Sequence, residues 1–349
     1  MMTLSLEVNN NAWTNHIKNI LNSYSSPVSE VTPVIKGNGY GIGRKNLATK
    51  ARELGISSVA VGTIFEAQDV LDQGFKEVLV MDPVKDIDEL AFNELTRIDN
   101  SSLLLTISCL KDAQNIGNNP VVVEGITSMN RFGIGINDLA EISRLNLKGI
   151  SLHFPIGNSK IGKTTEVANW LNSYKTLCPN GQKVVYLSHI SESELKNLTN
   201  QFPDFKFKVR VGTKLWIGDL KAFQIKSTVL EVHEPVNQNF GYRQRAITNK
   251  HRLIVVSGGT AHGIGLQAPR SNVTIKQRLV AILSGILEAF DVHISPFVIN
   301  GKQRWFAESP HMNVSLLKLP VNVSVPKVGS SISAQVRMTT TNFDCVVIR

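Results

Sequence analysis

The sequence of 349 residues has few cysteines and no long hydrophobic segment. Its three cysteines (Cys109, Cys178 and Cys345) lie far apart without metal-ligand spacing, which favours reduced thiols in the cytoplasm. The longest apolar runs fall short of the ~20 residues that span a bilayer. The first residues have neither the basic nor the apolar part of a secretory signal. We therefore expect a cytoplasmic protein without a bound metal and without a membrane partner.

Runs of like charge are also missing, although the formal net charge is +9. A basic chain is a candidate for nucleic-acid binding. Here the basic residues are dispersed, and neither zinc-finger spacing nor an aromatic-rich RNA-binding signature is found. The apolar fraction of 42% and charged fraction of 19% are typical of a globular protein. We expect no nucleic-acid partner, and a basic surface or an anionic ligand explains the charge as well.

Short β-branched runs alternate with helical patterns over the first ~215 residues, and this alternation predicts βαβ units with a parallel sheet. The segment 63–74 is expected to form one helix with Phe65, Val70 and Leu71 on one face. Eight such repeats close into a (β/α)8 TIM barrel, and an open doubly wound sheet is the alternative. The predicted strands are 31–35, 57–62, 77–82, 102–107, 120–125, 149–154, 183–188 and 207–212.

The pattern changes after about Gly218, where alternating strand segments begin with residues 223–236. One amphipathic helix, 277–290, looks like an insertion among them. The sequence thus predicts an α/β barrel domain over 1–220 and a mostly β domain over 221–349. The segment "TLSLEV" (3–8) reads as a strand without a helix before it, and is a candidate to pair with the second domain.

Active-site groups of such barrels follow the carboxyl ends of the strands. That rule selects Lys36, Glu124, His153, Ser191 and Arg210. A lysine near cationic groups and glycine-rich turns suggests an anionic cofactor held beside a reactive amine. Pyridoxal phosphate is a cofactor that needs these parts.

The motif "PVIKGNGYGIG" (33–43) resembles the cofactor-lysine motif V-K-A-N-A-Y-G-H-G of alanine racemases, and the later motifs follow in the same order. The resemblance implies a divergent member of these fold-type III pyridoxal phosphate enzymes. Lys36 would then bind the cofactor covalently and act as one catalytic base. Tyr40 would hydrogen-bond the cofactor phosphate.

Four further motifs extend this resemblance. "SMNRFGI" is similar to G-M-x-R-L-G-I, "SLHFPIG" supplies a histidine for the cofactor ring, "SHISESEL" resembles A-N-S-A-A-x-L, and "VRVGTKLW" resembles V-R-P-G-I-x-L-Y. The resemblance implies that a substrate carboxylate is bound by Arg131. It also implies further cofactor contacts from His153, Ser191, Arg210, Gly212 and Thr213, with Arg210 facing the ring nitrogen.

One departure concerns the second catalytic face. In the family a tyrosine of the partner subunit, within G-Y-A-D-G-Y, serves that face, and the matching stretch "GGTAHGIG" has Thr260 there. A threonine hydroxyl is a poor general base near neutral pH. His262 is the candidate replacement, because histidine titrates nearest to neutrality. Tyr242 is a second candidate, and loss of the group is the remaining alternative.

Three other positions bear on the resemblance. Glu124 stands where the family often has a carbamylated lysine, and so supplies a carboxylate directly. Phe343 replaces a tyrosine at the active-site entrance, whereas Met312 keeps a methionine of the substrate pocket that comes from the partner subunit. The resemblance therefore also implies a head-to-tail homodimer with shared active sites.

The function implied is an isomerase: an amino-acid racemase converting L-alanine to D-alanine for peptidoglycan. One alternative is another pyridoxal phosphate enzyme on this barrel, a decarboxylase or an aldolase. The other is a pyridoxal phosphate-binding protein with a regulatory role and lost or altered activity.

Overall fold

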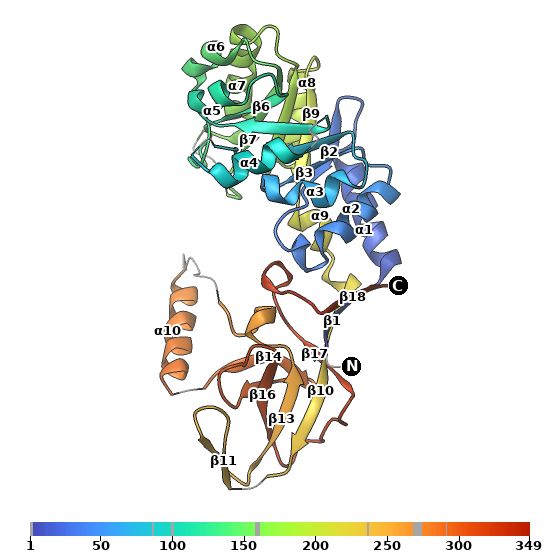
Figure 1. The fold of residues 1–349 in the computed structure, drawn as a ribbon, viewed down its shortest axis with the longest axis vertical. Coiled ribbons are helices and arrows are strands. Elements are labelled where there is room, and N and C mark those ends of the chain that lie inside the picture. Colours follow the sequence, from blue (N-terminus) through green and yellow to red (C-terminus); the bar gives the residue numbers. More distant parts are fainter. Residues whose placement is uncertain are drawn as a thin grey trace. The chain divides into compact units, whose positions relative to one another are not determined.

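The computed structural model describes residues 3–85, 87–98, 101–157, 161–235, 237–267, 274–290 and 292–349. The chain divides into two compact units, coloured along the sequence in Figure 1. One unit is Thr14–Gly218, and the other joins Met1–Trp13 with Asp219–Arg349. The division after Gly218 lies close to the predicted boundary at 220. Residues 3–13 lie within the predicted barrel domain 1–220 but fall in the other unit, and the expected pairing of the strand 3–8 with the second domain is confirmed.

The first unit is a near-closed barrel of eight parallel strands. The strand order β2-β9-β8-β7-β6-β5-β4-β3 runs once around the sheet without the reversal of a doubly wound fold. A parallel bridge between Val34 and Ala60 joins the two outer strands. The predicted TIM-like barrel is therefore confirmed. Its strands are β2 (Ser29–Pro33), β3 (Ser58–Val61), β4 (Glu77–Val80), β5 (Leu103–Ile107), β6 (Val121–Gly125), β7 (Leu147–His153), β8 (Val184–Ser188) and β9 (Lys206–Val211).

Helices follow the barrel strands along the chain. The expected helix over 63–74 is two shorter elements, η2 (Ile64–Glu66) and α3, and Phe65 is 52% exposed while Val70 is buried. The helices are α1 (Asn10–Tyr24), α2 (Arg44–Glu53), α3 (Gln68–Leu71), α4 (Glu89–Arg97), α5 (Leu110–Asn115), α6 (Leu139–Ile142), α7 (Lys163–Leu177), α8 (Glu192–Gln201) and α9 (Thr213–Ile217), with 3₁₀ turns η1 (Gly39–Gly41), η3 (Ile136–Asp138) and η4 (Leu220–Ala222).

A polar network crosses the barrel strands below the carboxyl ends. Lys208 donates to Glu77 at 2.6 Å and lies 3.5 Å from Glu30. The Glu77 carboxylate also accepts from Ser58 Oγ at 2.6 Å and from Tyr186 Oη at 2.9 Å. Burial raises the pKa of Glu77, but Lys208 and the two hydroxyl donors outweigh burial and hold that pKa below its usual range. The network thus compensates the positive charge of Lys208, whose side chain is only 8% exposed.

The second unit is an antiparallel β-barrel, which confirms the predicted mostly β domain. A closed ring runs through β10, β13, β16, β15, β14 and β17, because β10 pairs with both β13 and β17. β1 adds to β10 and pairs in parallel with β18. The ring encloses an apolar core that includes Leu4, Ile254 and Phe297. The elements are β1 (Leu4–Val8), β10 (Phe223–His233), β11 (Gln238–Phe240), β12 (Arg245–Ile247), β13 (His251–Ser257), η5 (Thr260–His262), β14 (Ile294–Ile299), β15 (Lys302–Phe306), β16 (Val314–Pro320), β17 (Ser331–Ala334), η6 (Met338–Thr340) and β18 (Cys345–Ile348).

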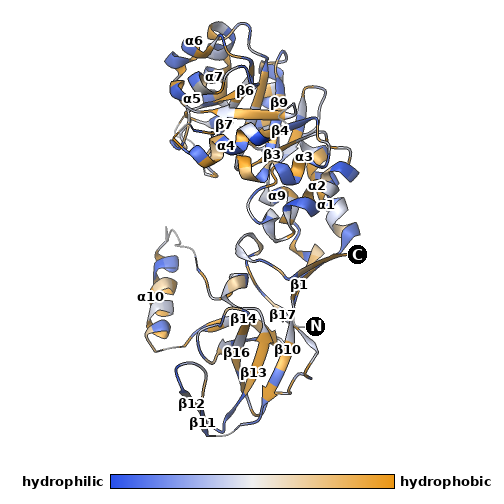
Figure 2. Cartoon of the chain, in the orientation of Figure 1, coloured by the Kyte–Doolittle hydropathy of each residue, from blue (hydrophilic) through white to orange (hydrophobic). Residues whose placement is uncertain are grey.

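The predicted inserted helix is α10 (Ile275–Ala289), which starts two residues earlier than expected. A capping box of Thr274 and Gln277 fixes its start. Figure 2 shows apolar and polar residues along this helix, and none of its residues is buried. The apolar face of this amphipathic helix therefore does not pack on a core formed by the described residues. No helix among the described residues is long and apolar enough to cross a membrane.

We expect Glu77→Gln to lower the free energy of unfolding by about 2–3 kcal/mol. Breaking a buried ion pair costs ~3–5 kcal/mol, and the 28% exposure of the Glu77 side chain reduces that figure. Because the folded-state pKa of Glu77 is lowered, its contribution is complete above the unfolded-state pKa. The contribution is lost as the pH falls through the folded-state pKa.

Urea denaturation of both proteins between pH 8 and pH 3 measures this difference. The matched control is Glu94→Gln, which removes a surface pair 3.8 Å from Arg97 and should change stability by less than about 0.5 kcal/mol. A difference for Glu77→Gln that stays constant down to pH 3 would contradict the assignment of the effect to its carboxylate.

Candidate active site

Arg210 occupies the interior of the barrel near the carboxyl end of β9. Its Nη2 donates to the Leu152 carbonyl at 3.2 Å, and its Nη1 lies 3.9 Å from a Glu124 oxygen. The side chain is 3% exposed. Within the described residues Nε has no hydrogen-bond partner. A buried unsatisfied donor is rare and is expected to have an acceptor from elsewhere.

Glu124, at β6, supplies the compensating carboxylate. It is buried, and its Oε2 accepts from the Ser151 hydroxyl. Burial raises the pKa of Glu124, while Arg210, Ser151 and Arg131 act in the opposite direction. Arg131 thus acts electrostatically on Glu124, but the ion pair of Glu124 is with Arg210.

Two histidines lie side by side at the rim. His153 ends β7, and His189 follows β8; their rings are edge-to-face with centroids 5.4 Å apart. His153 Nδ1 lies 2.9 Å from Ser188 Oγ, which also accepts from the Phe154 N–H. Burial, followed by the charges of Arg210, Arg131 and Lys36, lowers the pKa of His153 to about 3. His153 is therefore a neutral ring at physiological pH. His189 was not among the residues selected from the sequence.

Lys36 and Tyr40 belong to the glycine-rich segment after β2. Lys36 is exposed at the rim, where its charge acts on both rim histidines. Tyr40 is buried with a left-handed backbone at φ 55°. A Cβ at Gly212 would lie 2.2 Å from Tyr40 Oη, so the phenol packs where only glycine leaves room. Burial and the charge of Glu66 raise the pKa of Tyr40. The phenol is thus a neutral hydrogen-bonding group beside Gly212.

Glu66 fastens this segment to β3. Its two carboxylate oxygens accept from the Gly37 and Gly62 amides, each at 2.8 Å. Arg44 returns a hydrogen bond to the Gly37 carbonyl and pairs with Asp69 at 2.6 Å. The carboxylate and guanidinium thus fix the turn that follows Lys36, although the sequence analysis gave neither residue a role.

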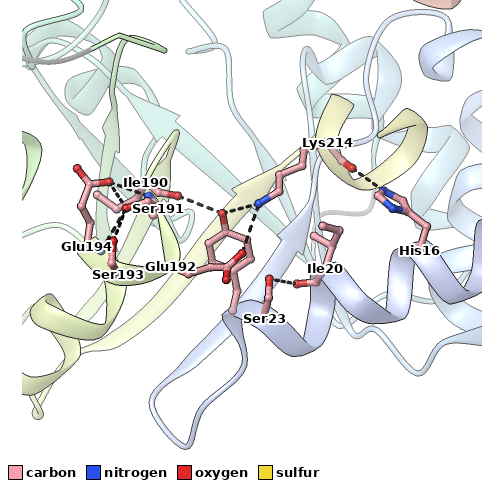
Figure 3. A network of polar contacts seen from close by, with 10 residues as sticks. His16, Ile20, Ser23, Ile190, Ser191, Glu192, Ser193, Glu194 and Lys214 are labelled. Carbon is pink, nitrogen blue, oxygen red and sulfur yellow. Dashed lines mark hydrogen bonds and ion pairs between the residues drawn. The ribbon is translucent and has the colours of Figure 1, made fainter. Parts of the chain in front are cut away.

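The start of α8 is shown in Figure 3. The Ser191 hydroxyl donates to Glu194 at 2.7 Å and accepts from the Glu194 N–H at 3.2 Å. The Ser191 N–H also donates to the Glu194 carboxylate, at 2.7 Å. Ser191 is therefore the N-cap of a helix in a complete capping box. To donate a hydrogen bond to a cofactor phosphate, this hydroxyl would first have to give up its hydrogen bond to the Glu194 carboxylate.

The remaining barrel residues lie at the surface. Arg131 is exposed, with its guanidinium 4.9 Å from the centre of the Phe132 ring. The charge of Arg131 affects the pKa values of Glu124, His153 and Arg210, so Arg131 lies near the same rim. Thr213 is exposed at the first residue of α9. Among the described residues, no group of three or more His, Cys, Asp or Glu is placed to hold a metal ion.

His262 lies in the β unit and is buried there. Its Nδ1 accepts from the Gly259 N–H at 3.2 Å, so Nε2 carries the proton and donates to Asp344 at 3.0 Å. Both nitrogens are therefore used inside the unit. This arrangement argues for a structural role, and against the expectation that His262 transfers protons to a substrate.

Other residues expected at the second face also lie in the β unit. Thr260 Oγ1 contacts the His311 carbonyl at 3.4 Å. Tyr242 is 84% exposed with its ring centroid 4.4 Å from that of His311. Met312 is 70% exposed, while Phe343 packs against the β core. A cavity of about 1,100 Å³ beside α10 is lined by Thr260 and Glu308, among others.

The chain thus has a near-closed parallel barrel and an antiparallel β-barrel as its two units. The chain belongs to the alanine racemase family, since the family profile described as "Alanine racemase, N-terminal domain" matches residues 8–216.

Individual relatives are distant. An alanine racemase of Fusobacterium nucleatum is 24% identical over 229 residues, covering 60% of this chain and 63% of the relative. That of Desulforamulus reducens is 29% identical over 161 residues, 42% of this chain and 43% of the relative. This chain thus aligns with less than two thirds of the length of either relative.

Solved structures extend the likeness over the whole fold. An alanine racemase from Bartonella henselae with covalently bound pyridoxal phosphate has a TM-score of 0.69 at 14% identity, covering 100% of both chains. One from E. faecalis has a TM-score of 0.67 at 15% identity, covering 99% of this chain and 98% of that one. At these identities the likeness establishes the fold alone.

Proposed function

We propose that this protein is a pyridoxal phosphate-dependent amino-acid racemase that interconverts the enantiomers of alanine or a similar small amino acid. The observation that carries the proposal is the unsatisfied Nε of Arg210, buried at the rim that also holds Lys36, His153 and Tyr40. Family membership supports the same conclusion. The product of such a reaction would be D-alanine for peptidoglycan, made in the cytoplasm.

The residues at the rim fit the cofactor. Lys36 would bind it covalently, the neutral ring of His153 would lie against its ring, and Arg210 Nε would face the ring nitrogen. Tyr40, Gly212 and Thr213 would hold the phosphate. Ser191 would join them only after its hydroxyl leaves Glu194.

Three groups of this chain then divide the chemistry. When bound, pyridoxal phosphate withdraws electrons from an attached amino acid and so acidifies its Cα–H. The Lys36 amine would remove or return the proton on one face, and Arg131 would bind the substrate carboxylate. Arg210 stays charged at all relevant pH values, which disfavours a second positive charge on the ring nitrogen. Weaker electron withdrawal suits a proton returned to Cα rather than to the cofactor.

A second candidate is a pyridoxal phosphate-binding protein with altered activity. The observations that favour it are the threonine at position 260 and the engagement of both nitrogens of His262.

The first prediction here concerns the cofactor. The purified protein should absorb near ~420 nm, as expected for pyridoxal phosphate joined to a lysine, and Lys36→Ala should lose this band. Lys175→Ala, a surface change in α7, is the control and should keep it. A borohydride-reducible adduct that persists in Lys36→Ala would refute the assignment.

The second prediction distinguishes the two candidate functions. Incubation with L-alanine and, separately, D-alanine in D₂O should give both Cα–H exchange and inversion, followed by NMR and chiral chromatography. Exchange requires a working base, and inversion requires proton transfer on both faces. A holoprotein that exchanges neither enantiomer would rule out racemisation of alanine and favour the binding role.

The third prediction concerns assembly. We propose a head-to-tail homodimer with shared sites, in which the exposed Met312 of the β unit lines the partner's substrate pocket. Sedimentation at micromolar concentration should give twice the chain mass of 38.4 kDa. A sedimentation mass equal to one chain would contradict the proposed dimer, and Met312 could then not line a partner's substrate pocket.

A further inference from the structure

The backbone of His189 is strained and held in place. It has φ 54°, in the left-handed region that non-glycine residues seldom adopt. Its carbonyl accepts from Lys163 Nζ at 2.7 Å, and the ammonium that donates is itself buried. Residues kept in such a conformation by their surroundings cluster at functional sites.

The next two residues are fixed as well (Figure 3). The Ile190 carbonyl accepts from Tyr24 Oη at 3.2 Å, and Tyr24 Oη in turn accepts from Lys214 at 3.2 Å. Ser191 is held by Glu194 at the start of α8. The whole turn after β8 is thus anchored to α1, α7, α8 and α9, so that the position of His189 is determined by structure around it.

His189 as a residue is, by contrast, exposed, although its neighbours still shield part of the ring. The centroids of the His189 and His153 rings lie 5.4 Å apart in an edge-to-face arrangement. Within the described residues, no hydrogen bond to the ring nitrogens of His189 is found. A backbone held rigidly with a free, titratable side chain at the rim is suited to exchanging protons with a ligand.

Four other described groups at the rim are poor candidates for a second proton-transfer group. The guanidinium groups of Arg131 and Arg210 do not deprotonate. His153 is engaged by Ser188 and stays neutral, because its pKa is lowered to about 3. The raised pKa of Tyr40 keeps its phenol protonated.

We propose that His189 is the acid/base that serves the Cα face opposite Lys36. The inference rests on the proposed function. In one direction Lys36 takes the Cα proton and the His189 imidazolium gives one back on the other face; in the reverse direction the imidazole takes the proton and the Lys36 ammonium returns one. Each turnover leaves one group protonated and the other deprotonated, and solvent exchange resets them.

The charges around His189 accord with this role. Burial, Lys163, Arg210 and Lys36 together lower the pKa of His189, and the neighbouring His153 ring carries no charge. A lowered pKa makes the imidazolium a stronger acid, so that it gives up its proton more readily to a ligand.

The test is His189→Asn in the holoenzyme. Asparagine tolerates the left-handed backbone better than most residues, so the turn and the ~420 nm band should be kept. Inversion should fall by about 10²- to 10⁴-fold, the usual contribution of a general acid/base. Cα–H exchange in D₂O should persist for the one enantiomer that presents its hydrogen to Lys36, and should be lost for the other.

His233→Asn, a surface change in β10, is the matched control and should racemise as the wild type does. Racemisation by His189→Asn within about threefold of the wild type would overturn the inference, as would equal loss of exchange for both enantiomers. If His262→Asn instead abolished inversion alone, the acid/base would be His262 and not His189.

A second readout does not depend on turnover. In the holoprotein labelled with ¹⁵N-histidine, the ring signals of His189, assigned by their loss in His189→Asn, should shift when L- or D-alanine is added. Signals that do not move although alanine binding changes the cofactor absorbance would overturn the inference and leave the proposed function intact. A wild type that neither binds nor exchanges alanine would overturn both.

Discussion

The buried guanidinium of Arg210 is the constraint on which the rest of the site depends. A charge within the barrel has to be compensated, and Glu124 and the Leu152 carbonyl do this only in part, since Nε has no partner among the residues that the structure describes. Removing the carboxylate of such a pair leaves a buried charge, which costs far more than the pair contributes. The geometry of β6, β7 and β9 at this level is therefore set by electrostatics as much as by packing.

The same charge divides the two rim histidines into different environments. His153 is hydrogen-bonded to Ser188, and Arg210 is the charge that acts on it most strongly. His189 is exposed on a turn held by Lys163, whose charge acts on His189 most strongly. The two histidines thus differ in acid–base behaviour, because the environment of a titratable group, and not its residue type alone, sets its pKa. A neutral ring suits contact with a cofactor plane, and a free imidazole suits proton exchange.

The barrel could be predicted from the sequence because its strands are β-branched and each is followed by a helical pattern. Even so, the first strand was expected over 31–35 and ends at Pro33, because the chain at Val34 only bridges to Ala60. The segment 63–74 has the period of a helix, but it starts as the 3₁₀ turn η2 and is α-helical only over α3 (Gln68–Leu71), with Ala67 in helical backbone conformation between them. Glu66 of η2 instead reaches the Gly37 and Gly62 amides.

At the site, motifs selected Lys36, His153 and Arg210, because strand ends and glycines are visible in sequence, and the charges of Lys36 and Arg210 do act on His153. The roles given to these residues stay predictions. The motifs did not lead to the hydrogen bond that the Ser191 hydroxyl donates to the Glu194 carboxylate, although "SESE" (191–194) contains a capping-box pattern. Nor could they identify His189, because a positive φ at a non-glycine residue depends on contacts with Lys163 far along the chain. His262 was selected for its nearness in sequence to Thr260, which does not reveal that Gly259 and Asp344 use both ring nitrogens.

The pairing of β1 with both β10 and β18 has a topological consequence. The barrel is an insertion within the β unit, entered after Trp13 and left at Gly218, so that a single cut cannot separate the two. During synthesis the barrel can close as soon as β9 has emerged, whereas β1 must wait for Phe223–His233 and then for Cys345–Ile348 to complete its pairing. Domains generally fold as units in order of synthesis. For this chain β1 is made before the barrel but paired after it, and the β unit is completed once the barrel has folded.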